Sequence, residues 1–232
     1  MKRSNTVTFV SAGMLSPKKR DHMLARRQLY LNYGALSLAT TLDTMGTSTL
    51  LVHGEHREPA DVLSMLLDKG VFPSRLPIML SIPSFYALRW AQTFCRLVRD
   101  IDPDARIIVG GRWVVGPDPD WLHAKLPEAD LLVPGLAEPL IASLLTNAPD
   151  LRLLPAPKPD VVLNHTLVSG FERYQPSIEA SRGCGMGCSF CEERDIPLEK
   201  LGEPQQFARA LAAVSSQYGD SEIRPYFQSS MF

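Results

Sequence analysis

Short apolar runs alternate with amphipathic helical patterns along the first part of this 232-residue chain. The strand-like runs are rich in β-branched residues, and one of them, Pro77–Ile82, is apolar almost throughout, as expected for a strand covered on both faces. The clearest helical pattern begins at Pro59 and ends before Gly70. Such alternation favours a parallel sheet between helices. The predicted strands are Val7–Ser11, Thr47–Val52, Pro77–Ile82, Arg106–Val109 and Ala129–Val133.

These elements predict an α/β fold built on a doubly wound, five-stranded parallel sheet of the Rossmann or flavodoxin type. The helix expected from Ser84 to Arg99 repeats apolar residues on one face, and Cys95 is among them, so Cys95 is expected to be a small core residue. The other expected helices include Leu36–Met45, the stretch from Pro59, and Glu138–Leu145.

Ligands of doubly wound sheets bind outside the carboxyl ends of the strands. Small residues follow several predicted strands there, and these make the candidate binding edge: Ser84, Gly110, Gly111 and Gly135.

A proline-rich stretch separates this pattern from the rest of the chain. It divides the sequence into a first domain (1–146), a linker (147–170) and a second domain (171–232). The second domain is expected to contain a strand at Ser177–Ser181, a helix from Pro204 and a strand at Ile223–Gln228.

Three of the four cysteines lie within eight residues of the second domain, as Cys184, Cys188 and Cys191. Thiolates in a C-x3-C-x2-C spacing suit an iron–sulfur cluster or zinc. A zinc site needs a fourth ligand, from Cys95 or a histidine. A disulfide framework fits poorly, because the cysteines are an odd set and Val7–Val10 is too short for the core of a secretory signal.

The run from Ile178 to Cys191 resembles the cluster loop of radical S-adenosylmethionine (radical SAM) enzymes, in particular the branch with an N-terminal cobalamin-binding-like domain. The resemblance implies that Cys184, Cys188 and Cys191 hold a [4Fe–4S] cluster whose open iron binds SAM, and that Phe190 lies beside the adenine of SAM. It further implies reductive cleavage of SAM to a radical, used for methyl transfer or another modification at an unreactive carbon.

The stretches Arg106–Gly111 and Ala129–Gly135 are similar to the cobalamin-binding-like domain of that branch, which implies that the candidate edge faces a corrin. No Asp-x-His-x-x-Gly motif, whose histidine ligates cobalt in the family, occurs in the sequence, so cobalamin binding is left open. All five histidines are interpreted as loop or surface residues: His22, His53, His56, His123 and His165.

The resemblance also implies a partial barrel of repeated βα units, of which this sequence holds the first unit and the next strand. We therefore expect a truncated chain, an incomplete gene product or half of a split enzyme that a second chain completes. Two alternatives remain: a non-catalytic cobalamin-like binding module with a vestigial cluster loop, and a zinc-stabilised interaction module.

Composition fits a cytoplasmic protein without membrane or nucleic-acid partners. The net charge is −1, and no apolar run approaches the roughly 20 residues that a membrane helix requires. Basic residues gather only in short clusters, such as Lys18–Arg20, which leaves no nucleic-acid footprint. The expected partners are SAM, an unidentified substrate and an electron donor for the cluster.

Overall fold

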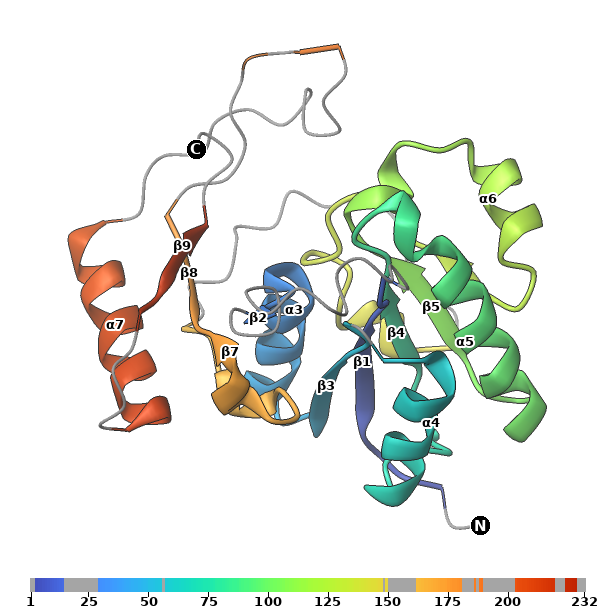
Figure 1. Ribbon diagram of the computed structural model, residues 1–232, viewed down its shortest axis with the longest axis horizontal. Coiled ribbons are helices and arrows are strands. Elements are labelled where there is room, and N and C mark those ends of the chain that lie inside the picture. The colour runs from blue at the N-terminus through green and yellow to red at the C-terminus, as the bar shows by residue number, and fades with distance from the viewer. Residues whose placement is uncertain are drawn as a thin grey trace.

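The computed structural model describes residues 3–14, 29–55, 57–147, 149, 162–180, 186, 188–189, 203–219 and 224–228. A five-stranded sheet with every pair parallel lies at its centre, in the order β3-β1-β4-β5-β6 (Figure 1). The strand order reverses between β1 and β4, which confirms the predicted α/β fold with a doubly wound sheet. The strands are β1 (Val7–Ser11), β3 (Thr49–His53), β4 (Ile78–Ser81), β5 (Ile107–Gly110) and β6 (Leu131–Leu132).

Five α-helices are described: α3 (Tyr33–Thr44), α4 (Pro59–Asp68), α5 (Leu88–Ile101), α6 (Pro119–Lys125) and α7 (Pro204–Tyr218). The predicted helix over Glu138–Leu145 is wrong, because this stretch forms turns that end in a short 3-10 helix, η3 (Ser143–Leu145). Leu140, Ile141 and Leu144 are nevertheless buried there. So short an apolar pattern does not distinguish a helix from successive turns.

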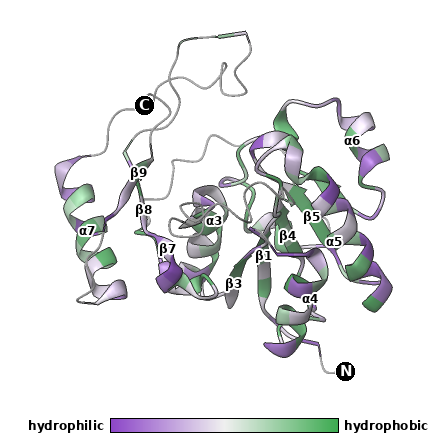
Figure 2. Cartoon of the chain, viewed as in Figure 1, coloured by the Kyte–Doolittle hydropathy of each residue, from purple (hydrophilic) through white to green (hydrophobic). Residues whose placement is uncertain are grey.

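Alternate residues of each strand enter two separate hydrophobic clusters, one on each face of the sheet. Ile78 and Leu80 of β4 pack with α4 and α5, whereas Met79 packs with α3 on the other face. Figure 1 shows α3 on one side of the strands and α4 and α5 on the other, and Figure 2 shows that the strands between them are largely hydrophobic. This period of two is what a strand covered on both faces requires.

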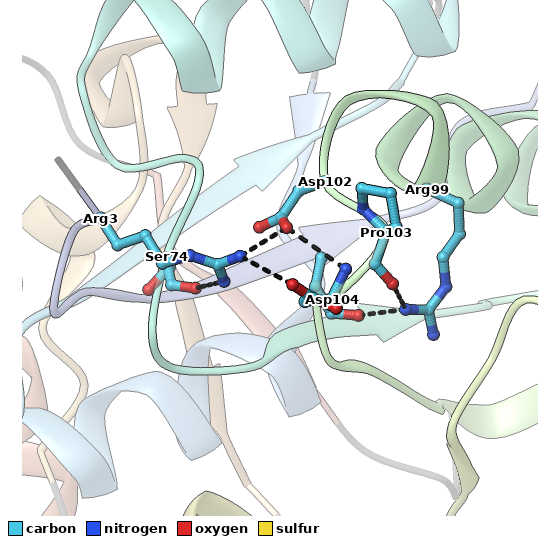
Figure 3. A network of polar contacts seen from close by, with 7 residues as sticks. Arg3, Ser74, Arg99, Asp102, Pro103 and Asp104 are labelled. Carbon is cyan, nitrogen blue, oxygen red and sulfur yellow. Dashed lines mark hydrogen bonds and ion pairs between the residues drawn. The ribbon is translucent and has the colours of Figure 1, made fainter. Parts of the chain in front are cut away.

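Ion pairs and hydrogen bonds close the amino edge of the sheet (Figure 3). The Arg3 guanidinium donates to Asp102 Oδ1 at 2.7 Å and to the Ser74 carbonyl oxygen at 3.3 Å. Arg99 donates to the carbonyl oxygens of Pro103 and Ala105 at 2.7 and 2.6 Å. These contacts hold together the segments that enter β1, β4 and β5, so this edge is structural.

The second part of the chain contains a small βαβ unit. Here β8 (Ser177–Glu179) pairs in parallel with β9 (Tyr226–Gln228), and α7 lies between them in sequence. This arrangement agrees with the expected βα unit followed by a further strand. A second short pair, β2 (Leu29–Tyr30) with β7 (Tyr174–Gln175), was not predicted.

Residues 162–170, which the sequence assigns to the linker, pack against the sheet. Leu163 and Val168 are buried in the same cluster as α3, and the Ser169 N–H donates to the Leu51 carbonyl oxygen at 2.8 Å. The remaining part of the predicted linker lies almost wholly outside the described residues. The division into domains stays a prediction.

The apolar spacing of these helices predicts that Ile101 of α5 and Leu211 of α7 are buried. Both predictions are wrong, because Ile101 is 44% exposed and Leu211 is 42% exposed. Within the described ranges, no helix combines the length and apolar character that crossing a membrane requires.

Candidate functional site

The cysteine motif follows the carboxyl end of β8. Of its ligand candidates, Cys188 is described as a partly exposed free thiol, while Cys184, Cys191 and Phe190 lie outside the described residues. The described residues contain no group of three or more His, Cys, Asp or Glu side chains arranged for a metal ion. Because two of the three cysteines fall outside that set, the predicted ligand group is not tested.

Cys95 is in a contrasting environment. Its side chain is fully buried in α5, as predicted, among Trp90, Phe94 and Val98. Burial, together with the nearby Glu128 carboxylate, raises the pKa of the Cys95 thiol to about 12. A thiol that stays protonated is a poor metal ligand, so Cys95 is not suited to be the fourth ligand of a zinc site.

His165 fastens β8 and α7 to the rest of the protein. Its Nε2 accepts a hydrogen bond from the Ser177 N–H at 3.2 Å, and its Nδ1 lies 3.0 Å from Gln217 Oε1. Since Nε2 accepts, the proton of the neutral ring lies on Nδ1 and is donated to Gln217. Gln217 Nε2 in turn donates to the Leu163 carbonyl oxygen at 3.0 Å.

The interpretation of His165 as a loop or surface residue is therefore wrong. It is 1% exposed, and burial lowers its pKa, with the hydrogen bonds acting in the opposite direction. The burial of His165 could not be predicted from the sequence. His165 follows a proline-rich stretch and belongs to a short 3-10 helix, η4 (His165–Leu167), which has no apolar periodicity.

The carboxyl end of β8 is held beside the N-terminus of α3. The Tyr33 hydroxyl, on the first residue of α3, donates to Glu179 Oε2 at 2.9 Å, and Glu179 is the last residue of β8. Tyr30, just before α3, makes an edge-to-face contact with Tyr226 of β9, with ring centroids 5.3 Å apart. The end of the strand that leads into the cysteine motif thus lies close to the carboxyl edge of the large sheet.

Asn32 bridges the switch point of that sheet. Its Nδ2 donates to Ser11 Oγ at the end of β1 and to Ser81 Oγ at the end of β4, each at 3.0 Å. Its Oδ1 accepts from the Ala35 N–H at 3.1 Å and so caps α3. The carboxamide therefore occupies the position between β1 and β4 where doubly wound sheets commonly hold ligands.

The predicted edge residues take different roles. A Cβ on Gly111 would meet the Ile82 nitrogen at 2.6 Å, and its φ is +108°, so this glycine permits close packing inside the protein. A Cβ on Gly110 would make only ordinary contacts with Val133, and the Ser84 hydroxyl donates to Met14 Sδ at 3.5 Å. Gly135 faces open space. The structure brings these residues to one edge but gives Gly111 and Ser84 internal contacts.

His53, the last residue of β3, was also interpreted wrongly as a loop or surface residue. It is 4% exposed, its Nε2 accepts from the Asn32 N–H at 3.4 Å, and its ring lies 4.9 Å from that of Tyr174. Burial, assisted by the Arg57 charge, lowers the pKa of His53 to about 4. The sequence signal for its position is the apolar run Thr47–Val52, because a residue at the end of such a strand reaches the carboxyl edge of the sheet.

The remaining histidines are placed as follows. His123 is exposed in α6, as expected, and His22 and His56 lie outside the described residues.

Within the described part of the chain, no hydrogen-bond partner is found for the Tyr174 hydroxyl or for Glu55 Oε1, which are both buried. Burial raises the pKa of Glu55, while the Arg57 and Arg173 charges oppose that shift. Glu55 follows β3 by two residues, so this polar group also belongs to the carboxyl edge. Sequence reasoning did not identify it.

Comparison with known proteins finds no family model and no curated protein that matches this chain.

Proposed function

We propose that Cys184, Cys188 and Cys191 hold a [4Fe–4S] cluster and that the chain belongs to the radical SAM lineage. The proposal assigns it reductive cleavage of SAM, for methyl transfer or another radical modification at an unreactive carbon. It rests on the C-x3-C-x2-C motif and on the structural context of that motif.

The observation that carries the proposal is the parallel pairing of β8 with β9 across α7. Residues 180–203, which include the motif, connect the carboxyl end of β8 to the N-terminus of α7. In α/β proteins, sites are built from such strand-to-helix connections, because they gather at one edge of the sheet. A cluster site in this strand-to-helix connection would agree with that architecture, which supports the proposal.

The described donor also fits a cluster ligand. Cys188 is a partly exposed free thiol, unlike the buried Cys95, so a metal can reach it. A bound cluster would supply the electron for SAM cleavage. The chain's own residues orient the site: His165 and Gln217 fix the start of β8, and the Tyr33 hydroxyl fixes its end.

Cobalamin is less well supported by the described residues. Asn32 fills the switch point, Gly111 packs against Ile82, and the buried His53 accepts a hydrogen bond from the Asn32 N–H. With the switch point filled in this way, these residues do not fit a corrin there.

A non-catalytic module with a vestigial cluster loop is the second candidate. The observation that favours it is the sparse burial of α7, in which Val214 is the one buried residue among those described. For the enzyme hypothesis, the partners would be SAM, a substrate and an electron donor for the cluster. We place either form in the cytoplasm.

The test is anaerobic reconstitution with iron and sulfide, followed by metal and sulfide analysis. We expect about four iron and four sulfide per wild-type chain. Cys184→Ala, Cys188→Ala and Cys191→Ala should each lose most of both, and Cys95→Ala, the matched control, should retain them. Zinc without sulfide in the wild-type chain would favour the zinc module, and equal iron in all variants would refute the assigned ligands.

A further inference from the structure

The segment Leu29–Tyr33, here named the bridge segment, contacts both the large sheet and the smaller β8–α7–β9 unit. On one side, the Asn32 carboxamide holds the ends of β1 and β4 by two hydrogen bonds, each 3.0 Å long. On the other side, the Tyr33 hydroxyl donates to Glu179 Oε2 at 2.9 Å. Consecutive residues of one segment therefore hold the switch point of the large sheet and the last residue of β8.

Two further contacts join the bridge segment to the second part of the chain. Its first two residues form β2, which pairs in parallel with β7, the strand that precedes β8. Tyr30 meets the ring of Tyr226 on β9 edge to face, with ring centroids 5.3 Å apart. The bridge segment thus contacts β7, β8 and β9, so it determines where the end of β8 lies relative to the large sheet.

Tyr33 is well held on the large sheet. It is the first residue of α3, and the Asn32 side chain caps this helix by accepting from the Ala35 N–H at 3.1 Å. The Tyr33 ring is partly buried and packs against the hydrophobic cluster that contains α3. A side chain whose own position is set by packing and by a neighbouring hydrogen bond can place the group that it binds. Tyr33 therefore serves as a fixed anchor for Glu179.

The smaller unit has little packing of its own with which to fix β8. Val214 is the one buried residue of α7 among those described, and Phe227 of β9 is 50% exposed. His165 accepts from the N–H of Ser177, the first residue of β8, and so holds the opposite end of this three-residue strand. The bond from Tyr33 ties the carboxyl end of the strand to the large sheet.

The anchored residue is close in sequence to the cysteine motif. Glu179 precedes Cys184 by five positions. Five residues of extended chain span at most about 18 Å, so the first ligand of the proposed cluster follows soon after the anchor. Because displacements of about 1 Å are enough to impair a reactive site, the position of Glu179 matters for a site that begins so near it.

We propose that Tyr33 is a positioning residue for the cluster, an inference that rests on the proposed function. Its hydroxyl acts through Glu179 to hold the start of the strand-to-helix connection that carries the cysteines, and this role requires no contact with the cluster. Three thiolates supply the ligands with or without the bond, so its removal should leave iron uptake unchanged. SAM binding should weaken, because a site that is no longer held in place must be ordered when SAM binds.

Hydrogen exchange of the metal-free chain tests the anchor independently of any cluster. Tyr33→Phe removes the hydroxyl and keeps the ring. We expect exchange in residues 178–180 to become at least about fivefold faster than in the wild-type chain, and exchange in β1, β4 and β5 to stay unchanged. Tyr86→Phe is the matched control, because Tyr86, in η1 (Phe85–Ala87), is 78% exposed. Unchanged exchange in Tyr33→Phe would overturn the proposal.

Electron paramagnetic resonance of the reconstituted chain, titrated with SAM, tests the positioning itself. Tyr33→Phe should retain about four iron per chain, while the SAM concentration that gives half of the spectral change should rise at least about fivefold. Tyr86→Phe should match the wild-type chain in both. A merely structural bond would leave this SAM concentration unchanged, and that result would overturn the proposal. Loss of most of the iron from Tyr33→Phe would also overturn it.

Glu179→Ala and the double variant Tyr33→Phe/Glu179→Ala test whether Tyr33 acts through Glu179. In the Glu179→Ala background, Tyr33→Phe should cause no further rise in the SAM concentration. A rise as large as that in the wild-type background would overturn the proposal. A wild-type chain that takes up no cluster would refute the proposed function and this inference with it. A wild-type cluster that responds to SAM, together with no effect of Tyr33→Phe, would refute this inference alone.

Discussion

The large sheet and the β8–α7–β9 unit use the same parallel βαβ connection, but they bury very different amounts of apolar surface. The sheet is covered on both faces, and two clusters of buried residues fill the space beneath its helices. In the smaller unit α7 buries Val214 alone among the described residues, and Phe227 of β9 is 50% exposed. The sheet therefore carries its own core, whereas the smaller unit relies on the contacts that attach it.

Among the described residues, these contacts include the hydrogen bonds of His165 with Ser177 and Gln217 and the bond from the Tyr33 hydroxyl to Glu179. The ring contact of Tyr30 with Tyr226 adds to them. A region stabilised by few buried contacts opens locally before the whole protein unfolds. We therefore expect substitutions in the core of the sheet to lower the free energy of unfolding strongly. Substitutions of the residues that attach the smaller unit should affect mainly that unit.

The largest effect is expected from Phe94→Ala. Phe94 is fully buried in α5 and stacks on Trp90 at 5.2 Å, so removing its ring should lower the free energy of unfolding by about 3–5 kcal/mol. Phe85→Ala, the matched control, removes an exposed ring and should change it by less than about 0.5 kcal/mol. Urea unfolding followed by circular dichroism measures both, and similar values for the two variants would contradict this picture of the core.

Acid should destabilise the sheet through His53. Its pKa is about 4 in the folded protein against 6.5 for the free side chain, so the unfolded chain binds the extra proton between those values. The neutral His53 side chain contributes to the free energy of unfolding in full above about pH 6.5. This contribution, on the order of 3 kcal/mol in total, is lost as the pH falls toward about 4.

His53→Gln isolates this contribution from the titration of other groups. The free energy of unfolding, measured from pH 7 to pH 4, should fall less steeply in the variant than in the wild-type protein. Parallel curves for the two proteins would mean that His53 does not titrate in this way.

A smaller and local effect is expected from His165→Ala. The substitution leaves the buried Ser177 N–H without its acceptor, which should cost about 1–3 kcal/mol. Hydrogen exchange should accelerate in β8 and α7 and stay unchanged in β1, β4 and β5. His123→Ala, on the exposed face of α6, is the control, and uniform acceleration across the whole chain would show that the two regions unfold together.

The sheet could be predicted because its signals are local. The bounds of β1 match the prediction, Pro59 and Pro204 begin helices, and Pro77–Ile82 contains β4. The pairing of β2 with β7 could not be predicted, since two-residue strands from distant parts of the chain carry no periodic pattern.

The candidate site could be predicted only in part, because only some of its residues lie close together in the sequence. A cysteine motif is visible in sequence because its ligands lie close together. Residues such as Asn32, His53 and His165 acquire their roles from partners that lie far away in the chain. Gly111 shows the converse: a small residue at a strand end is explained by packing against Ile82 as well as by a ligand.

The most direct test of the proposed function is electron paramagnetic resonance of the reconstituted and reduced wild-type chain, with and without SAM. We predict the signal of a reduced [4Fe–4S] cluster that changes when SAM is added, because SAM would bind the iron that the three cysteines leave open. A cluster signal that SAM leaves unchanged would contradict the radical SAM assignment. Absence of a cluster signal from a folded chain would contradict the cluster itself.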